Sequence, residues 1–178
     1  MKTNLFITGA SGFIGFHVAK RYLDMGFKVR GFDSMNSYYD IKLKKSRLNI
    51  LKRYKNFSFI KGNLENQKML DYAIIKFKPS IIIHLAAVSH ANKSNKDPHS
   101  TFDHSLRTLE NTLDFSKDKK THVIYMSSSM VYGDFKSESV NEDETCKPIG
   151  IYGSLKYSGE IILKSYNKNK ISENDLFE

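Results

Sequence analysis

The sequence has few of the features that define several other classes of protein. Its only cysteine, Cys146, excludes an internal disulfide and a metal site built from cysteines alone, and we expect no metal. No apolar run reaches the roughly 18 residues that a membrane-spanning helix needs. No apolar signal region precedes a cleavage site, because the first apolar run is itself a predicted strand. We therefore expect a cytoplasmic protein without a membrane partner.

Basic residues outnumber acidic residues, but they do not form a dense block in the sequence. The 178 residues include 28 lysines and arginines against 19 aspartates and glutamates, which gives a net charge of +9. Such a charge attracts either nucleic acid or small anions. The basic residues are scattered among asparagine and isoleucine, and no nucleic-acid-binding motif accompanies them. We expect a mild attraction for phosphorylated substrates and no nucleic-acid partner.

A glycine-rich turn near the N-terminus is the strongest local signal. The apolar run Leu5–Ile7 ends at this turn, and the apolar residues of Phe13–Leu23 then recur at helical spacing. The free N–H groups and dipole of a helix N-terminus favour a phosphate there. Gly9 allows the tight turn, Gly12 lets the backbone approach a pyrophosphate, and Gly15 lets helix and strand pack closely. The spacing differs from the common dinucleotide fingerprint, so a turn without a ligand is the alternative.

An acidic residue follows at the end of the second predicted strand. Asp33 ends the segment Lys28–Asp33 and lies 18 residues after Gly15. A carboxylate at about this separation can accept hydrogen bonds from the adenosine ribose hydroxyls. It would repel a 2′-phosphate, so this position favours NAD over NADP. An acid that only caps the next turn is the alternative.

Strands alternate with helices along the whole chain. Further strands are predicted at 56–60, 80–87 and 122–127, and further helices at 40–54, 67–77, 98–115 and 150–167. This alternation predicts an α/β fold with a doubly wound parallel sheet, Rossmann-like, whose ligand lies at the carboxyl ends of the strands. The charged residues of 40–54 are predicted to form a solvated face. His84 is predicted to be a hydrogen-bonded histidine at a strand end.

A tyrosine and a lysine share one face of the last predicted helix. Tyr152 and Lys156 are four residues apart. A phenol is a poor base at neutral pH, but a nearby ammonium stabilises the phenolate. Tyr152 could then take a proton from a substrate hydroxyl while hydride leaves for NAD, and Ser128, at a neighbouring strand end, could hold that hydroxyl. An ordinary pair on a helix surface is the alternative.

Together these segments resemble the NAD-dependent epimerase/dehydratase family, which are extended short-chain dehydrogenases/reductases. The resemblance is carried by Thr8–Gly15, Asp33, His84–Ala87, Ser127–Gly133, Tyr152 and Lys156. Within the family, the segment Asp33–Asp40, with Leu43–Lys44 and Arg47–Leu48, is similar to nucleotide-sugar 4-epimerases acting on UDP-glucuronate, and Tyr38-Tyr39-Asp40 is the more specific part. The resemblance implies that NAD is held by Gly9, Ser11, Gly12, Phe13, Ile14, Gly15, Asp33, Asn63, Leu64, Leu85, Ala86, Ala87, Tyr152 and Lys156.

The resemblance also implies a reaction at C4 of a nucleotide sugar, of the UDP-glucuronate or UDP-galactose type. Tyr152 would deprotonate the 4-hydroxyl, Lys156 would bind the nicotinamide ribose, and Ser128 would hydrogen-bond the sugar oxygen. The 4-keto sugar would turn over before hydride returns to its other face. The sugar dehydratases of the family carry an Asp-Glu pair after the residue matching Ser128, whereas this chain has Ser129-Met130.

Several positions depart from the family pattern. Asn63 stands where an aspartate usually contacts adenine, and an amide can still hydrogen-bond. Asn92-Lys93 replaces an arginine–tyrosine pair usual in the UDP-glucuronate epimerases, and Ser105 stands where an asparagine often lies near the cofactor. Family members continue into a smaller C-terminal domain that binds the nucleotide sugar. We therefore expect an NAD-binding domain over residues 1–167, a polar tail over 168–178 and a missing substrate domain.

Three functions stay open at this point. The first is an NAD-dependent nucleotide-sugar 4-epimerase, or its N-terminal portion. The second is an NAD-binding fragment without turnover, which needs a complementing C-terminal chain. The third is a reductase, dehydratase or decarboxylase of the same family. A homodimer is an expectation by analogy with the family.

Overall fold

The computed structural model describes residues 3–37, 40–87, 96–116, 121–135 and 138–174. The strands are β1 (Asn4–Thr8), β2 (Lys28–Asp33), β3 (Phe57–Lys61), β4 (Ile81–His84) and β5 (His122–Tyr125). The helices are α1 (Phe13–Asp24), α2 (Ile41–Leu51), α3 (Gln67–Ile75), α5 (Pro98–Phe102), α6 (Thr108–Ser116) and α7 (Gly150–Asn174). A π-helical turn, η1 (Asp103–Arg107), joins α5 to α6, and a 3₁₀ turn, η2 (Ser129–Val131), follows β5.

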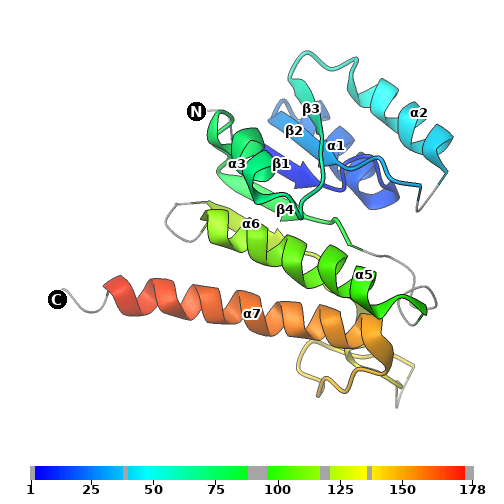
Figure 1. Ribbon diagram of the computed structural model, residues 1–178, viewed down its shortest axis with the longest axis vertical. Coiled ribbons are helices and arrows are strands. Elements are labelled where there is room, and N and C mark those ends of the chain that lie inside the picture. Colours follow the sequence, from blue (N-terminus) through cyan, green and yellow to red (C-terminus); the bar gives the residue numbers. More distant parts are fainter. Residues whose placement is uncertain (1–2, 38–39, 88–95, 117–120, 136–137, 175–178) are drawn as a thin grey trace.

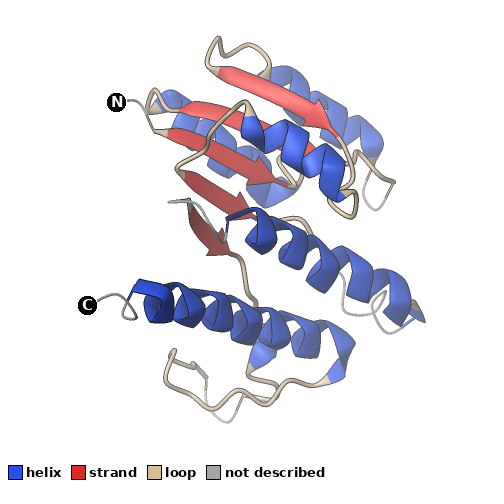
Figure 2. Ribbon diagram, turned by 60° about the vertical axis from the view of Figure 1, so that its left-hand side comes forward, coloured by secondary structure: helices blue, strands red, loops and turns tan. Residues whose placement is uncertain are grey.

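The five strands form one sheet in the order β3-β2-β1-β4-β5, and every neighbouring pair is parallel (Figures 1 and 2). This confirms the predicted doubly wound α/β fold. The chain builds outward from β1 to β3 and then returns to the other side of β1 with β4. Doubly wound sheets bind ligands at the carboxyl ends of the strands where the order reverses. In this chain that place is the end of β1 beside the end of β4.

Two apolar clusters cover the two faces of the sheet. Because side chains alternate along a strand, Leu5 and Ile7 of β1 point to one face and Phe6 points to the other. The first cluster packs β1 against α1 and α2, and it includes Leu23 and Leu51. The second packs Phe6 with residues of α3 and with Phe115 of α6, while α7 runs alongside α6 (Figure 1). Both ligand-facing loops after β1 and β4 are thereby supported by a rigid core.

Some predicted boundaries are wrong. The last helix was expected to end at Asn167, but α7 continues to Asn174, into the predicted tail. The helix expected over 98–115 is interrupted by the π-helical turn η1. The helix expected over 40–54 ends at Leu51. No helix in the described part of the chain is long and apolar enough to cross a membrane.

Candidate active site

A cavity of about 460 Å³ opens at the carboxyl ends of the strands. Fourteen of the fifteen residues predicted to bind cofactor or substrate line it. These are Gly9, Gly12, Phe13, Ile14, Gly15, Asp33, Asn63, Leu64, Leu85, Ala86, Ala87, Ser128, Tyr152 and Lys156. The exception is Ser11, which is fully buried and donates its backbone N–H to Asp33 Oδ2 at 3.0 Å. Residues far apart in the sequence therefore meet in one place, as the fold predicts.

The glycine turn has the geometry that was expected at Gly9 and Gly15. Gly9 has a φ of +69°, a conformation that residues with a side chain rarely adopt, and its N–H donates to the Phe32 carbonyl oxygen at 2.8 Å. A Cβ on Gly15 would overlap the Gly9 carbonyl oxygen, so only glycine lets α1 approach the turn this closely. Gly12 is the N-cap of α1 and supplies no side-chain cap. The first turn of α1 therefore has no side-chain cap, and the N–H groups of such a turn favour an anion.

The loop after β4 is fixed to the end of β1. Thr8 Oγ1 accepts hydrogen bonds from the N–H groups of Leu85 at 3.0 Å and Ala86 at 3.1 Å. Ala86 also lies against Gly9, where a Cβ would come within 3.1 Å of the Ala86 nitrogen. These contacts hold the two loops that flank the reversal of strand order in one arrangement.

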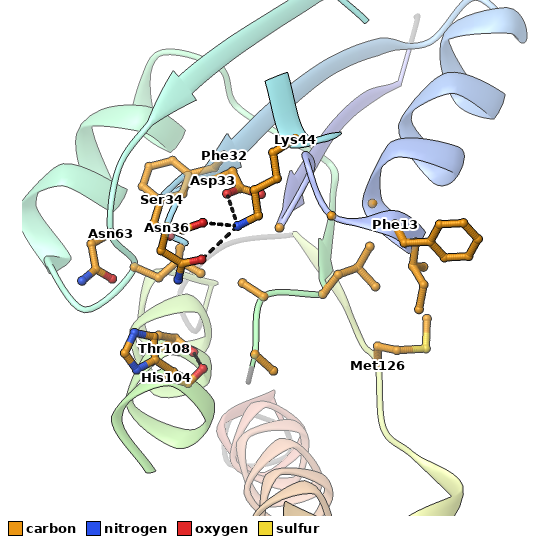
Figure 3. A pocket seen from close by; sticks show the side chains of 18 of the residues that line it. Phe13, Phe32, Asp33, Ser34, Asn36, Lys44, Asn63, His104, Thr108 and Met126 are labelled. Atoms are coloured by element: carbon orange, nitrogen blue, oxygen red, sulfur yellow. Dashed lines mark hydrogen bonds and ion pairs between the residues drawn. The ribbon is translucent and has the colours of Figure 1, made fainter. Parts of the chain in front are cut away.

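Asp33 lies at the end of the cavity that adjoins α2, and its carboxylate already has several partners (Figure 3). Oδ2 accepts from Ser11 N–H, and Oδ1 accepts from Met35 N–H at 2.8 Å. Lys44 Nζ lies 3.7 Å from Oδ1 and donates to the Asn36 carbonyl oxygen at 3.1 Å and to its side-chain Oδ1 at 2.9 Å. Asp33 therefore caps the following turn, as the alternative interpretation expected, and also lines the cavity, while its contact with a ribose stays a prediction.

Lys44 is a site residue that the sequence reasoning missed. The prediction of a solvated face over 40–54 is wrong at this position, because Lys44 is only 5% exposed and lines the cavity. The available signal was its spacing. Lys44, Leu48 and Leu51 lie at i, i+4 and i+7, which is the buried stripe of α2. A lysine on such a stripe needs polar partners, and Asn36 and Asp33 supply them.

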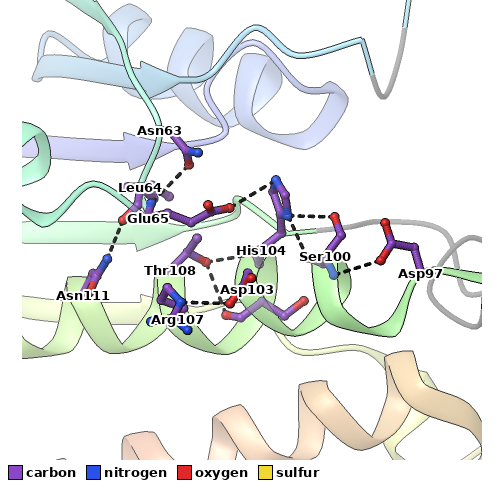
Figure 4. Close-up of polar contacts among 11 residues, drawn as sticks. Asn63, Leu64, Glu65, Asp97, Ser100, Asp103, His104, Arg107, Thr108 and Asn111 are labelled. Carbon is purple, nitrogen blue, oxygen red and sulfur yellow. Dashed lines mark hydrogen bonds and ion pairs between the residues drawn. The ribbon is translucent and has the colours of Figure 1, made fainter.

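The wall of the cavity near Asn63 is tied to the α5–η1–α6 segment (Figure 4). Asn111 Nδ2 donates to the Leu64 carbonyl oxygen at 2.7 Å, and His104 Nε2 lies 3.3 Å from Glu65 Oε1. Asn63 Oδ1 in turn accepts from Glu65 N–H at 3.1 Å. His104 comes from the π-helical turn and lines the cavity, and local π-helical geometry often occurs at functional sites. The sequence reasoning did not single out His104 or Glu65.

The opposite end of the cavity holds the predicted catalytic residues. Lys156 is 4% exposed, and its burial lowers the pKa of its ammonium to about 8. Nζ lies 6.0 Å from the centre of the Tyr152 ring and donates to the Met126 carbonyl oxygen at 2.8 Å. Ser128 Oγ accepts from Met130 N–H at 3.3 Å, which holds the serine at the start of η2. A cation, a phenol and a hydroxyl therefore share this end of the cavity.

His84 is buried behind this group. Its Nδ1 lies 3.2 Å from Thr112 Oγ1, and burial together with the charge of Lys156 lowers the pKa of the imidazole to about 3. Its Nε2 has no hydrogen-bond partner among the described residues, so the prediction of a fully satisfied histidine holds for one nitrogen only. A neutral imidazole at this place adds no positive charge beside Lys156.

Both the sequence and the fold of this chain match known proteins. A family model described as GDP-mannose 4,6 dehydratase matches residues 6–172, which is most of the chain. The chain belongs to this family of NAD-dependent epimerases and dehydratases. The resemblance seen in the sequence is thereby confirmed at the level of the family.

Several relatives of this chain are named as UDP-glucuronate 4-epimerases. A probable UDP-glucuronate 4-epimerase of Rhizobium meliloti is 39% identical over 162 residues, covering 90% of this chain and 48% of that protein. The protein CapI of Staphylococcus aureus is 34% identical over 165 residues, covering 92% of this chain and 49% of that protein. The chain therefore spans about half the length of the curated relatives it matches.

Solved structures of 4-epimerases are also similar to this chain in fold. The UDP-glucuronic acid 4-epimerase of Bacillus cereus, crystallised with UDP-glucuronic acid and NAD, superposes with a TM-score of 0.83 at 30% identity. The match covers 94% of this chain and 53% of that one. The UDP-glucose 4-epimerase of Brucella ovis, in complex with NAD, superposes with a TM-score of 0.79 at 26% identity, covering 92% of this chain and 47% of that one.

Two sequence features, one that matches the family pattern and one that departs from it, lie outside the described residues. These are Tyr38 and Tyr39 of the Tyr-Tyr-Asp motif, and Asn92-Lys93, which replace the arginine–tyrosine pair. Ser105, by contrast, is described and is buried in η1, one residue after His104. Ser129 and Met130, which stand in place of the Asp-Glu pair of the sugar dehydratases, form the first two residues of η2.

Proposed function

We propose that this chain is the cofactor-binding half of an NAD-dependent nucleotide-sugar 4-epimerase of the UDP-glucuronate or UDP-galactose type. The observation that carries the proposal is the joint placement of the glycine turn, Ser128, Tyr152 and Lys156 around one cavity. The similarity to UDP-glucuronate 4-epimerases supports the choice of reaction.

The described residues fit NAD along the whole cavity. The uncapped N-terminus of α1 fits the pyrophosphate, because its N–H groups and dipole favour an anion. Asp33 and Asn63 lie toward the end where the adenosine would bind, and Tyr152 and Lys156 lie where the nicotinamide ribose would bind. Two structural neighbours crystallised with NAD support this placement.

The proposed chemistry assigns one role to each residue at the catalytic end. Bound NAD would supply the hydride acceptor and donor at C4 of the sugar. Tyr152 takes the proton from the 4-hydroxyl and returns it after the sugar has turned over. Lys156 stabilises the phenolate with its ammonium, which is still largely charged at pH 7 because its pKa is about 8. Ser128 hydrogen-bonds the sugar oxygen and orients it toward Tyr152.

The absence of an Asp-Glu pair after Ser128 supports epimerisation over water elimination. A 4,6-dehydratase needs acids to move the protons of elimination, and Ser129 and Met130 carry no group that titrates near neutral pH. The rest of the sugar-binding surface belongs to a part of the relatives that this chain does not match.

The first experiment is calorimetric titration of the purified chain with NAD, with NADP as the comparison ligand. Saturable binding of NAD at a 1:1 ratio supports the cofactor site, and no binding contradicts it. The second is incubation of the NAD-loaded chain with UDP-glucuronate and chromatographic identification of the product. The 4-epimer supports the proposed reaction, a reduced or decarboxylated sugar contradicts it, and binding without turnover indicates a fragment that needs a complementing chain.

A further inference from the structure

We propose that Lys44 sets the cofactor selectivity of this site by offsetting the negative charge of Asp33, so that the site excludes a 2′-phosphorylated cofactor less strongly than Asp33 alone would. This inference rests on the proposed binding of NAD. It assigns a role to Lys44, which belongs to the segment that matches the family but is not among the residues predicted to hold NAD.

The packing of α2 fixes the position of Lys44 beside the cavity. Asp40 caps α2 by accepting from Lys42 N–H at 2.7 Å, and the helix then presents Lys44, Leu48 and Leu51 on its buried stripe. Leu51 is fully buried in the cluster between the sheet and α1. Turning Lys44 out to solvent would turn Leu51 out as well. The ammonium is therefore held at the cavity by packing and not by surface attraction.

The contacts of Lys44 fix its charge beside Asp33. Its side chain is 6% exposed, and two hydrogen bonds to Asn36 hold Nζ at 3.7 Å from Asp33 Oδ1. Figure 3 shows this ammonium pointing into the space between Asp33 and Asn36 at one end of the cavity. Salt screens a buried ion pair of this kind less than an exposed one, so both charges contribute to the field that a ligand bound beside them meets.

The ion pair between Lys44 and Asp33 affects which group a cofactor can carry at the adenosine 2′ position. A carboxylate alone repels a 2′-phosphate and accepts a hydrogen bond from a 2′-hydroxyl. Asp33 instead faces the cavity with two backbone N–H donors and one cation around it, so the local net charge from Lys44 and Asp33 is close to zero. A 2′-phosphate therefore meets a neutral pair that includes an ammonium donor, and the penalty against NADP falls.

The test compares dissociation constants for NAD and NADP by calorimetry in four chains: wild type, Lys44→Met, Asp33→Asn and Lys45→Met. Lys44→Met leaves Asp33 uncompensated, so we expect the ratio of NADP to NAD dissociation constants to rise by at least about tenfold. Asp33→Asn leaves Lys44 uncompensated and should lower the same ratio by at least about tenfold. Lys45 is exposed on the same helix, and its replacement should leave the ratio unchanged.

Asp33→Asn removes the repulsive carboxylate and lowers the ratio whether or not Lys44 acts, so Lys44→Met decides the role of Lys44, and Lys44→Gln takes its place if Lys44→Met does not fold. An unchanged ratio in either folded Lys44 variant overturns the role of Lys44 while leaving NAD binding intact. A change of equal size in Lys45→Met overturns it too, because general surface charge would then explain the effect. A wild-type chain that binds neither nucleotide refutes the proposed function itself, and the inference falls with it.

Discussion

Lys156 Nζ donates a hydrogen bond of 2.8 Å to the carbonyl oxygen of Met126, and Met126 directly precedes the serines that follow β5. The same ammonium lies 4.8 Å from the centre of the Tyr125 ring. The lysine of the predicted tyrosine–lysine pair thus joins α7 to the strand end that carries Ser128. One side chain supports both the position of the serine and the charge near Tyr152.

This buried charge should cost stability. Burial lowers the pKa of Lys156 from 10.5 to about 8, so the unfolded chain holds this proton more tightly than the folded chain does. The cost is present in full below pH 8 and disappears as the pH rises toward 10.5, so stability should increase over that interval. We expect Lys156→Met to raise the free energy of unfolding at pH 7 by about 1–3 kcal/mol. Urea denaturation at pH 7 and pH 10 measures this.

The matched control for this experiment is Lys164→Met, because Lys164 is exposed on the same helix. It should change the free energy of unfolding by less than about 0.5 kcal/mol at either pH. A loss of stability in Lys156→Met at pH 7 would show that the hydrogen bond to Met126 outweighs the cost of burying the charge.

Replacement of the proposed base should separate chemistry from cofactor binding. Tyr152→Phe removes the phenolic oxygen and keeps the ring beside Lys156. We expect epimerase turnover to fall by at least about a hundredfold, because general acid–base catalysis contributes about that much or more. The dissociation constant for NAD should change by less than about threefold, since the ring and the glycine turn remain. Calorimetry and a product assay on the same preparation give both numbers, and parallel losses would refute this division of roles.

A methyl group should be tolerated far less well at Gly15, in the glycine turn, than at Gly26, which follows α1. Gly15→Ala would place a Cβ against the Gly9 carbonyl oxygen, whereas a Cβ at Gly26 meets nothing within 4 Å. We expect Gly15→Ala to lower the free energy of unfolding by about 2–4 kcal/mol and to abolish measurable NAD binding. Gly26→Ala should cost about 1 kcal/mol through its φ of +83° alone and leave binding intact. Equal effects of the two variants would contradict the close-packing role of Gly15.

The fold and most of the residues that line the cavity could be predicted from the sequence, because both depend on local signals. Apolar runs such as Ile81–Ile83 indicate strands buried on two faces, and strict alternation with helices leaves few sheet topologies. The carboxyl ends of parallel strands meet at one edge, so Asp33, Asn63 and Ser128 could be expected to converge before any coordinates were known.

The residues that the sequence did not reveal depend on contacts over long separations. Lys44 is one of several basic residues in its helix, and its burial follows from the packing of Leu48 and Leu51 beside it. Glu65 and His104 are 39 positions apart, and they meet only because α6 packs beside α3. The π-helical turn that carries His104 also has no sequence pattern of its own, since an inserted residue in a helix is accommodated by its tertiary surroundings.

The contact between His104 and Glu65 leads to a last prediction, about the wall formed by Asn63, Leu64 and Glu65. His104 Nδ1 lies 2.7 Å from the Ser100 carbonyl oxygen, and Nε2 lies 3.3 Å from Glu65 Oε1. Both neighbours are acceptors, so the ring pairs with both of them only in the form in which each nitrogen carries a proton. Both side chains are about one-third exposed, so their coupling should be modest, about 0.3–1 kcal/mol. We expect His104→Ala and Glu65→Ala each to speed hydrogen exchange at the Glu65 and Asn66 amides, and the double variant to be no faster than either single one. The amide of Leu5, which is fully buried in β1, is the internal control and should keep its protection in every variant. Additive effects in the double variant would mean that the two side chains act on this wall independently, and would overturn the coupling between them.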